Sequence, residues 1–355
     1  MATLEDVAKR AGVAGSTVSH VINGTRFVSE ATKAAVQAAI AATGYVPNTL
    51  ARALARSRTN MIGAALSAVS NPQFMDLIYA IEAECTARNW LVLFADTKED
   101  PTHELECVRR LHQQRVDGIV LATCGKAEGP SLTYLIEQNV PAVLVDRLVS
   151  RKFSQVGAEN SHAMRQLVNH LAGLGHRRIA MIAGRPHVAT TVERVEAYRR
   201  ALETHGIGAD DKLIHDGSDE EASFTRLLTL RPAPTAIIAG NNRSMIRLMQ
   251  VLHTLRRQVP KDLAVVGFDD FDWADCFSPR LTVIAQPIGE IAKRAIQLLE
   301  RRIEDENTPP QTIRLRPRLI VRESCGSELR FIERTRNGYQ GSKAKLQRSA
   351  DVSSR

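Results

Sequence analysis

Residues 15–26, "GSTVSHVINGTR", combine small polar side chains with groups that can hydrogen-bond to the edges of bases. Gly15, Ser16 and Thr17 are small enough to let a backbone approach the major groove of DNA. Ser16 and His20 lie four residues apart, so they share one face if the segment is helical. Arg26 follows shortly afterwards. The pattern favours a helix that reads base edges, although polarity alone would also fit a solvated surface helix.

A second segment, residues 47–60, reads "PNTLARALARSRTN" and places two leucines among arginines. Asn48 is suited to cap a helix in which Leu50 and Leu54 share a face. Such a helix would have about two turns, and isolated helices shorter than roughly 12–15 residues are marginal in water. The segment is therefore either a plain linker or a helix that depends on a partner.

The residues around the first segment predict three short helices. Thr3 and Asp6 have the spacing of a capping box that opens "LEDVAKRA". The glycines suited to end the three helices, and the serine suited to cap the third, are Gly12, Gly24, Gly44 and Ser29. Three short helices, the first two joined by a tight turn, form a helix-turn-helix unit. So small a unit buries little core, and we expect it to be only modestly stable.

From residue 61 onward, short apolar runs alternate with amphipathic segments. The runs are "MIGAALSA", "WLVLFADT", "DGIVLATC", "PAVLVDR", "RIAMIAG", "TAIIAGN", "LAVVGFDD" and "LTVIAQP". Apolar strands that alternate with helices, such as residues 74–88 and 102–114, indicate parallel sheets covered on both faces. This many units fits two similar lobes better than one sheet. Ligands of such folds bind beyond the carboxyl ends of the strands, where the sequence places Asp96, Asp146, Arg147, Asn241, Asn242, Asp269 and Asp270.

Charge is distributed unevenly along the 355 residues, whose formal net charge is +8. Seven lysines and arginines face three acidic residues in 1–60 and again in 327–355, so the stretch between them is neutral. A basic head on a neutral body is typical of a domain that meets a polyanion. The last segment has no apolar periodicity, and we expect a disordered basic tail.

Several protein classes are disfavoured by the sequence. No apolar run approaches the roughly 20 residues of a membrane span, and "MATLEDVAKR" lacks the apolar region of an export signal. Five widely spaced cysteines without a C-x-x-C pair argue for a reduced cytoplasmic setting. The glycine motifs of dinucleotide enzymes, hydrolases and P-loop proteins are missing, so we expect neither an enzyme nor a cofactor. We expect no metal site either, because Glu159, His162, His170 and His176 fit a helix end followed by a strand.

Residues 3–55, from "TLEDVAKRAG" to "NTLARALA", resemble the DNA-binding head of the lactose-repressor family of bacterial regulators. The resemblance continues through "NPQF", "RVDGIVLA", "LGHRRIAMIAG", "VERVEAYRRAL", "VPKDLAVVGFDD" and "RLIVRES", and covers residues 2 to about 325. It implies a homodimer, or a dimer of dimers, that binds a pseudo-palindromic operator in double-stranded DNA. It also implies a core similar to periplasmic sugar-binding proteins, with a small sugar or sugar derivative bound between two lobes.

The resemblance gives the second segment a role. In this family the matching segment is a hinge that becomes helical on DNA, and the leucine matching Leu54 enters the minor groove and kinks the duplex. Such a wedge costs a few kcal/mol of base unstacking, which the wider contact on bent DNA offsets. The hinge residues that we expect to contact the minor groove or phosphates are Asn48, Ala51, Arg52, Leu54 and Arg56.

The resemblance also implies effector-binding residues in the core. These are Gln73, Phe74, Arg147, Arg194, Asn241 and Asp269, with Trp273 as a weaker candidate that fits packing in the core or at a dimer interface equally well. Sugar recognition needs polar groups for pairs of hydroxyls together with an apolar or aromatic face. Three positions depart from the family pattern: Ala14 replaces a capping serine, and Asn242 and Ala197 replace an aspartate and a glycine expected beside the ligand cleft.

Together these features predict an all-α helix-turn-helix head with a hinge helix, joined to an α/β two-lobed core of the type I periplasmic-binding-protein kind. The expected domains are the head at 1–46, the hinge at 47–60, the effector-binding and dimerisation core at 61–326, and the tail at 327–355. We expect a cytoplasmic DNA-binding regulator, foremost a repressor, controlled by a sugar-like effector. A regulator with a purine-type corepressor is the alternative. A solute-binding protein is a remote one, since it would carry a signal peptide and lack the head.

Overall fold

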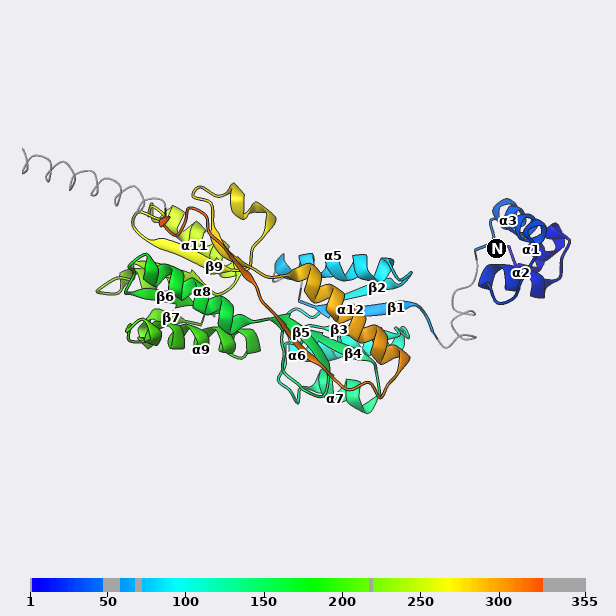
Figure 1. The fold of residues 1–355 in the computed structure, drawn as a ribbon, viewed down its shortest axis with the longest axis horizontal. Coiled ribbons are helices and arrows are strands. Elements are labelled where there is room, and N and C mark those ends of the chain that lie inside the picture. Colours follow the sequence, from blue (N-terminus) through cyan, green and yellow to red (C-terminus); the bar gives the residue numbers. More distant parts are fainter. Residues whose placement is uncertain (1, 47–57, 68–71, 217–219, 328–355) are drawn as a thin grey trace, which may run out of the picture. The chain divides into compact units, whose positions relative to one another are not determined.

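The computed structural model describes residues 2–46, 58–67, 72–216 and 220–327 (Figure 1). The chain divides into two compact units, Met1–Thr59 and Asn60–Arg355. The expected hinge residues 47–57 and nearly all of the expected tail, residues 328–355, lie outside the described residues. Among the described helices, none is long and apolar enough to cross a membrane.

The first unit contains the three predicted helices, α1 (Leu4–Ala11), α2 (Gly15–Asn23) and α3 (Glu30–Thr43). The capping box is confirmed, since Thr3 Oγ1 accepts from the Asp6 N–H at 3.2 Å and Asp6 Oδ2 accepts from the Thr3 N–H at 2.8 Å. The three glycines that end the helices adopt the left-handed conformation, which glycine takes without steric cost. The small core that holds the helices together is Val7, Ala8, Val18, Val36 and Ala39.

The second unit contains two six-stranded sheets, each forming one lobe. The sheet of the first lobe has the order β11-β5-β4-β3-β1-β2, and its strand pairs are parallel. Its strands are β1 (Met61–Leu66), β2 (Leu91–Asp96), β3 (Gly118–Leu121), β4 (Ala142–Val145), β5 (Ser154–Ala158) and β11 (Thr312–Leu315). Its helices are α5 (Pro72–Thr86), α6 (Pro101–Gln113), α7 (Pro130–Glu137) and α12 (Ile288–Glu304).

The second lobe repeats this arrangement with the strand order β12-β10-β9-β8-β6-β7. Its strands are β6 (Ile179–Ile182), β7 (Ile214–His215), β8 (Ala236–Ala239), β9 (Ala264–Phe268), β10 (Thr282–Ala285) and β12 (Arg318–Ile320), of which β12 runs antiparallel to β10. Its helices are α8 (Asn160–Gly173), α9 (Ala189–Thr204), α10 (Glu220–Thr229) and α11 (Asn242–Thr254). Two short 3-10 helices, η1 (Asp211–Leu213) and η2 (Asp272–Cys276), complete it.

The central strands of each sheet are buried on both faces, as their apolar residues require. Successive residues of a strand point to opposite faces. In β1, Ile62, Ala64 and Leu66 belong to one hydrophobic cluster, whereas Ala65 belongs to another with Ile119 of β3. The second lobe likewise has two clusters. The two-lobed α/β prediction is therefore confirmed, and so are all eight predicted strands.

The chain crosses between the lobes three times, from β5 to α8, from β10 to α12 and from β11 to β12 (Figure 1). These crossings place the loops that follow the strands of both sheets around one space between the lobes. Four strands were not predicted: β5, β7, β11 and β12. They are short or carry glycine and arginine, so they lack the apolar run that marks a central strand.

Candidate functional site

The α2 helix presents the polar face that its sequence predicts. Ser16 is exposed and His20 is half-buried. His20 Nδ1 shares a hydrogen bond of 2.8 Å with Thr25 Oγ1, which fixes the imidazole ring near the end of the helix. Arg26 is exposed just beyond Gly24, where α2 ends.

Gly15 and Thr17 have local structural roles that the sequence interpretation did not include. A Cβ atom on Gly15 would lie 3.2 Å from Leu4 Cδ2, so the glycine lets α1 and α2 pack closely. Thr17 is half-buried beside Val18, the only fully buried residue of α2 among those described. No side chain caps the N-terminus of α2, where Ala14 stands. Phe27, next to Arg26, is 96% exposed and was not singled out from the sequence.

The predicted hinge contacts cannot be placed in the same way. Asn48, Ala51, Arg52, Leu54 and Arg56 all lie outside the described residues. Their assignment stays a prediction from the sequence.

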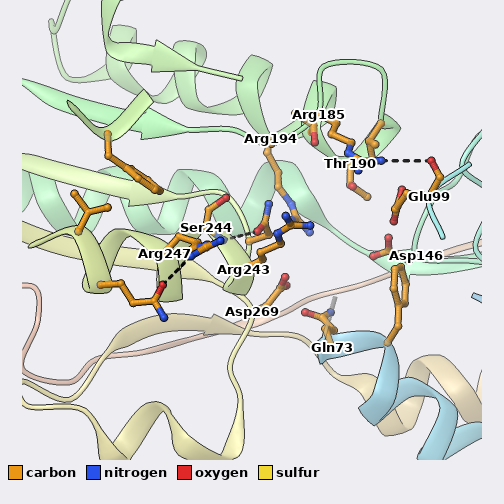
Figure 2. A pocket seen from close by; sticks show the side chains of 18 of the residues that line it. Gln73, Glu99, Asp146, Arg185, Thr190, Arg194, Arg243, Ser244, Arg247 and Asp269 are labelled. Atoms are coloured by element: carbon orange, nitrogen blue, oxygen red, sulfur yellow. Dashed lines mark hydrogen bonds between the residues drawn. The ribbon is translucent and has the colours of Figure 1, made fainter. Parts of the chain in front are cut away.

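Between the two lobes lies a cavity of about 760 Å³ (Figure 2). That volume is within the range of roughly 300–1,000 Å³ typical of small-molecule sites. Six of the seven predicted effector-binding residues line it: Gln73, Phe74 and Arg147 from the first lobe, and Arg194, Asn241 and Asp269 from the second. The structure thus brings together residues that are up to about 200 positions apart in the sequence.

Trp273 does not line this cavity, so the structure does not bring it to the predicted site. It belongs to η2 and is 44% exposed. Its ring stacks on Phe277 at 5.9 Å and lies 4.6 Å from the ring of Phe271. Trp273 therefore packs against two aromatic rings at the surface and not in the core, and its place at a dimer interface stays a prediction.

Arg147 is held at the first-lobe wall by several contacts. Its Nη1 donates to the Thr123 carbonyl oxygen at 3.0 Å, and its Nη2 pairs with Glu99 Oε1 at 2.5 Å. Its guanidinium carbon lies 5.6 Å from the centre of the Phe74 ring. A buried cation with a carboxylate and an aromatic face beside it offers both parts of a sugar-binding surface.

Arg194 has a comparable position at the second-lobe wall. Its Nε donates to Asn160 Oδ1 at 2.9 Å and its Nη1 to the Gly240 carbonyl oxygen at 2.6 Å. Its guanidinium carbon lies 3.5 Å from the centre of the Phe268 ring, at the end of β9. The stacking and the hydrogen bonds of Nε and Nη1 leave the Arg194 guanidinium little rotational freedom, so this group is pre-oriented for a ligand.

Asp269 connects the two walls. Its Oδ1 accepts from Gln286 Nε2 at 2.7 Å. With its amide nitrogen turned toward this carboxylate, Gln73 of the first lobe donates to both Asp269 oxygens, at 2.9 Å to Oδ2. Arg185 makes a second contact between the lobes, since its Nη1 donates to the Glu99 carbonyl oxygen at 3.3 Å. Gln73 and Arg185 therefore join the two lobes beside the cavity.

Asp146 and Asp269 follow equivalent strands of the two lobes, β4 and β9, and both have positive φ, at 65° and 75°. Aspartate tolerates this region better than most residues. Burial raises the pKa of Asp146 to about 6, although Arg147 and Arg194 oppose the shift. Burial also raises the pKa of Asp269, against the effects of Arg194, Gln286 and the Asn242 N–H.

Several lining residues were not identified from the sequence: Glu99, Arg185, Thr190, Thr191, Arg243, Ser244 and Arg247. Arg243 and Arg247 lie four residues apart on α11, where the sequence looks like an ordinary solvated helix face. Conversely, Asp96 and Ala197 do not line the cavity, and Ala197 packs in the core of the second lobe instead. Asn242, the other departure expected beside the cleft, does not line the cavity either, although Ala197 lies three residues after Arg194 on α9 and Asn242 directly follows Asn241.

The four residues considered above for a metal site do not form one. In the described ranges, no group of three or more histidine, cysteine, aspartate or glutamate side chains could hold a metal ion. His176 Nδ1 shares a hydrogen bond with Thr235 Oγ1 at 3.0 Å, and His162 Nδ1 accepts from Arg165 at 3.4 Å. Ordinary structural contacts thus account for these two histidines.

Two models of known families match separate parts of the chain. Residues 3–48 match the model of bacterial regulatory proteins of the lacI family, and residues 168–325 match that of a periplasmic binding protein-like domain. The ribose operon repressor of Escherichia coli (strain K12) is 36% identical over 331 residues, which are 92% of this chain and 100% of that protein.

Two solved structures are similar along nearly the whole chain. A complex of the transcriptional regulator CelR with cellobiose is 33% identical, with a TM-score of 0.69, covering 91% of this chain and 100% of that one. A Lac repressor dimer bound to operator and the anti-inducer ONPF is 25% identical, with a TM-score of 0.80, covering 91% and 99%. With its helix-turn-helix head, its two-lobed core and a relative matched over its full length, the chain belongs to the lacI family of bacterial regulatory proteins.

Proposed function

We propose that the protein is a transcriptional repressor that binds a pseudo-palindromic operator through α2 and the hinge, as a homodimer or a dimer of dimers. The observation that carries this proposal is the presence, in one chain, of a helix-turn-helix head and a cavity lined from two lobes. The similar Lac repressor was solved as a dimer on its operator. Two copies of α2 related by a two-fold axis would match the two halves of such a DNA site.

A sugar or sugar derivative is the effector that the cavity fits best. Arg147 and Glu99 on one wall, and Arg194 and Asp269 on the other, supply paired donors and acceptors of the kind that adjacent hydroxyls need. Glu99 Oε2 is buried without a hydrogen-bond partner among the described residues, and a ligand hydroxyl would satisfy it. The similar CelR was solved with cellobiose. Nothing in this arrangement requires an enzymatic reaction, and we propose that the protein acts in the cytoplasm.

The proposal is tested in two steps with the full chain. Selection from a random DNA library should yield a site with two-fold symmetric half-sites, bound in a gel shift. Ribose, cellobiose, other sugars, sugar acids and purines are then screened by thermal shift, where a true effector raises the melting temperature with concentration. That effector should also change the affinity for the selected DNA. Failure to select any DNA sequence would contradict the proposed repressor function. If a purine is the sole effector found, the proposal of a sugar effector is wrong and the effector is a purine.

A further inference from the structure

A chain of polar contacts joins the crossings between the lobes to the cavity wall. It starts at Arg314 on β11, immediately before the chain crosses to β12, and continues through Glu193 on α9. Arg314 Nη1 donates to Glu193 Oε2 at 3.0 Å, and Arg314 Nη2 donates to Glu193 Oε1 at 2.6 Å. This two-bond geometry is the strong form of an arginine–carboxylate pair. It joins a helix of the second lobe to a strand of the first-lobe sheet.

The same carboxylate reaches a second crossing. Asn160 is the first residue of α8, directly after the chain leaves β5, and is 1% exposed. Its Nδ2 donates to Glu193 Oε2 at 2.8 Å. The two crossings are also neighbours in the sheet, because β11 pairs with β5 and the Glu159 N–H donates to the Leu315 carbonyl oxygen at 2.8 Å. Glu193 therefore contacts both crossing segments at the point where they leave the first lobe.

The other end of the Asn160 amide holds the cavity residue. Asn160 Oδ1 accepts from Arg194 Nε at 2.9 Å, and Arg194 lines the cavity. Since Nδ2 of this amide donates to Glu193 and also to the Ala158 carbonyl oxygen at 3.5 Å, the amide cannot rotate without breaking hydrogen bonds. The orientation of Asn160 thus fixes which edge of the Arg194 fork faces the ligand.

A movement of the lobes must affect this series of polar contacts. A change in the angle between the lobes requires rotation within the crossings, and the Arg314–Glu193 pair is anchored on both sides of them. Packed and hydrogen-bonded segments switch between discrete arrangements rather than deform continuously. When the angle between the lobes changes, the Arg314–Glu193 ion pair is therefore either kept intact or broken.

We propose that Glu193 is a positioning residue that couples the angle between the lobes to the orientation of Arg194 in the effector site. This inference rests on the proposed function, because it assigns a regulatory role within the same cavity. It extends that function to a residue that does not line the cavity. Replacement of Glu193 should loosen the lobes and weaken the link between effector and operator, while operator binding without effector persists.

The test uses the full chain carrying Cys276→Ser, which replaces the exposed cysteine, and one fluorophore on each lobe, at Glu137→Cys and Glu203→Cys. Energy transfer without ligand reports the distribution of distances between the lobes. Glu193→Gln and Arg314→Met should each broaden the distribution of distances between the lobes toward larger values. Because both changes remove the same ion pair, the distribution of the double variant should be no broader than that of either single variant. Glu196→Gln is the matched control, since Glu196 lies one turn away on α9 and pairs with Arg200 at 3.6 Å on the same helix.

The second readout is the change in operator affinity caused by ribose or cellobiose, measured by gel shift on the selected DNA. In Glu193→Gln this change should shrink by roughly two- to thirtyfold, the range found for residues along coupling networks, with the melting temperature close to that of Glu196→Gln. An unchanged distance distribution in Glu193→Gln, or additive effects in the double variant, would overturn the coupling role even if operator binding is normal. If the unmodified chain binds no DNA, the proposed function fails instead, and the distance measurement still decides the role of Glu193.

Discussion

At the residue scale, His20 is the side chain most suited to distinguish bases. Its Nδ1 is engaged with Thr25, so Nε2 is the ring atom that we expect at a base edge. His20→Ala should relax the preference at one position of each half-site by about 1–3 kcal/mol. Replacement of the hinge residue Arg52 should instead weaken binding to all sequences and flatten the salt dependence, because phosphates carry no sequence information. Competition gel shifts with single-base variants of the operator compare the His20 and Arg52 variants. If both lose affinity equally for all sequences, His20 contacts a phosphate.

Asp146 predicts a pH dependence of stability. Its pKa is about 6 in the folded protein, above the ordinary value of 3.8, so the folded state holds the proton more tightly than the unfolded state. The cost of burying the ionised carboxylate is therefore absent below about pH 4, grows between about pH 4 and pH 6, and is complete above pH 6. Asp146→Asn, which tolerates the same positive φ, removes that cost.

The variant should thus be more stable than the natural protein above pH 6, by at most about 3 kcal/mol for a shift of this size. The difference should vanish near pH 4. Chemical unfolding of the ligand-free protein at several pH values measures it, with the exposed Glu137→Gln as control. A difference that is constant across this pH range would mean that titration of Asp146 is not its cause.

At the element scale, the N-terminus of α2 lacks a capping side chain. Ala14 has the extended backbone of an N-cap, with φ −70° and ψ 150°, but accepts no side-chain hydrogen bond. Ala14→Ser should stabilise the helix by about 0.5–2 kcal/mol, because its hydroxyl can accept from a free N–H of the first turn. Hydrogen exchange of the α2 amides in the full chain should slow accordingly. Exchange in α3, whose N-cap Ser29 already accepts from Thr32, serves as the internal control.

The hinge is the other element whose behaviour can be predicted, here from the sequence alone. Leu54→Ala should weaken operator binding and reduce DNA bending, since the apolar wedge that holds a base step open is shortened. Ligand affinity of the core should not change. Gel shifts with circularly permuted DNA report the affinity and the bend together. Leu50→Ala is the matched control, and equal bending by the Leu54 variant and the natural protein would contradict the wedge.

At the scale of the whole molecule, effector and operator must affect each other reciprocally, with a coupling free energy typically of 1–3 kcal/mol. Asp269 of the second lobe accepts from Gln73 of the first lobe and from Gln286 in the crossing from β10 to α12, so it should be needed for the ligand to hold the lobes together. In an induced repressor, Asp269→Ala should lose ligand binding in calorimetry and keep normal operator binding. If the effector is a corepressor, the same variant should bind operator under no condition.

Asp96→Asn is the control for this experiment. Asp96 lies at the end of a strand, β2 of the first lobe, just as Asp269 follows β9 of the second lobe, but Asp96 does not line the cavity. Arg194→Ala should behave like Asp269→Ala. Unchanged ligand affinity in either variant would remove that residue from the site.

The sequence by itself determined the head and the central strands. Helix caps such as Thr3 with Asp6, terminal glycines such as Gly12, and long apolar runs such as residues 61–66 act through neighbours within a few positions. Such local signals can be recognised without knowing the rest of the fold. The resemblance to known regulators added six of the cavity residues, among them Gln73 and Asp269, which carry no local sign that they meet.

Only the tertiary structure decided the rest of the cavity and its links to the crossings. Arg185, Glu99 and Arg247 lie in loops or on exposed helix faces, where nothing local separates a lining residue from a solvated one. Trp273 shows the converse, because its sequence neighbourhood beside Asp269 suggested the site while η2 turns its ring toward Phe277. The physical reason is that three crossings between two sheets set which loops face each other. That arrangement depends on the packing of the complete chain.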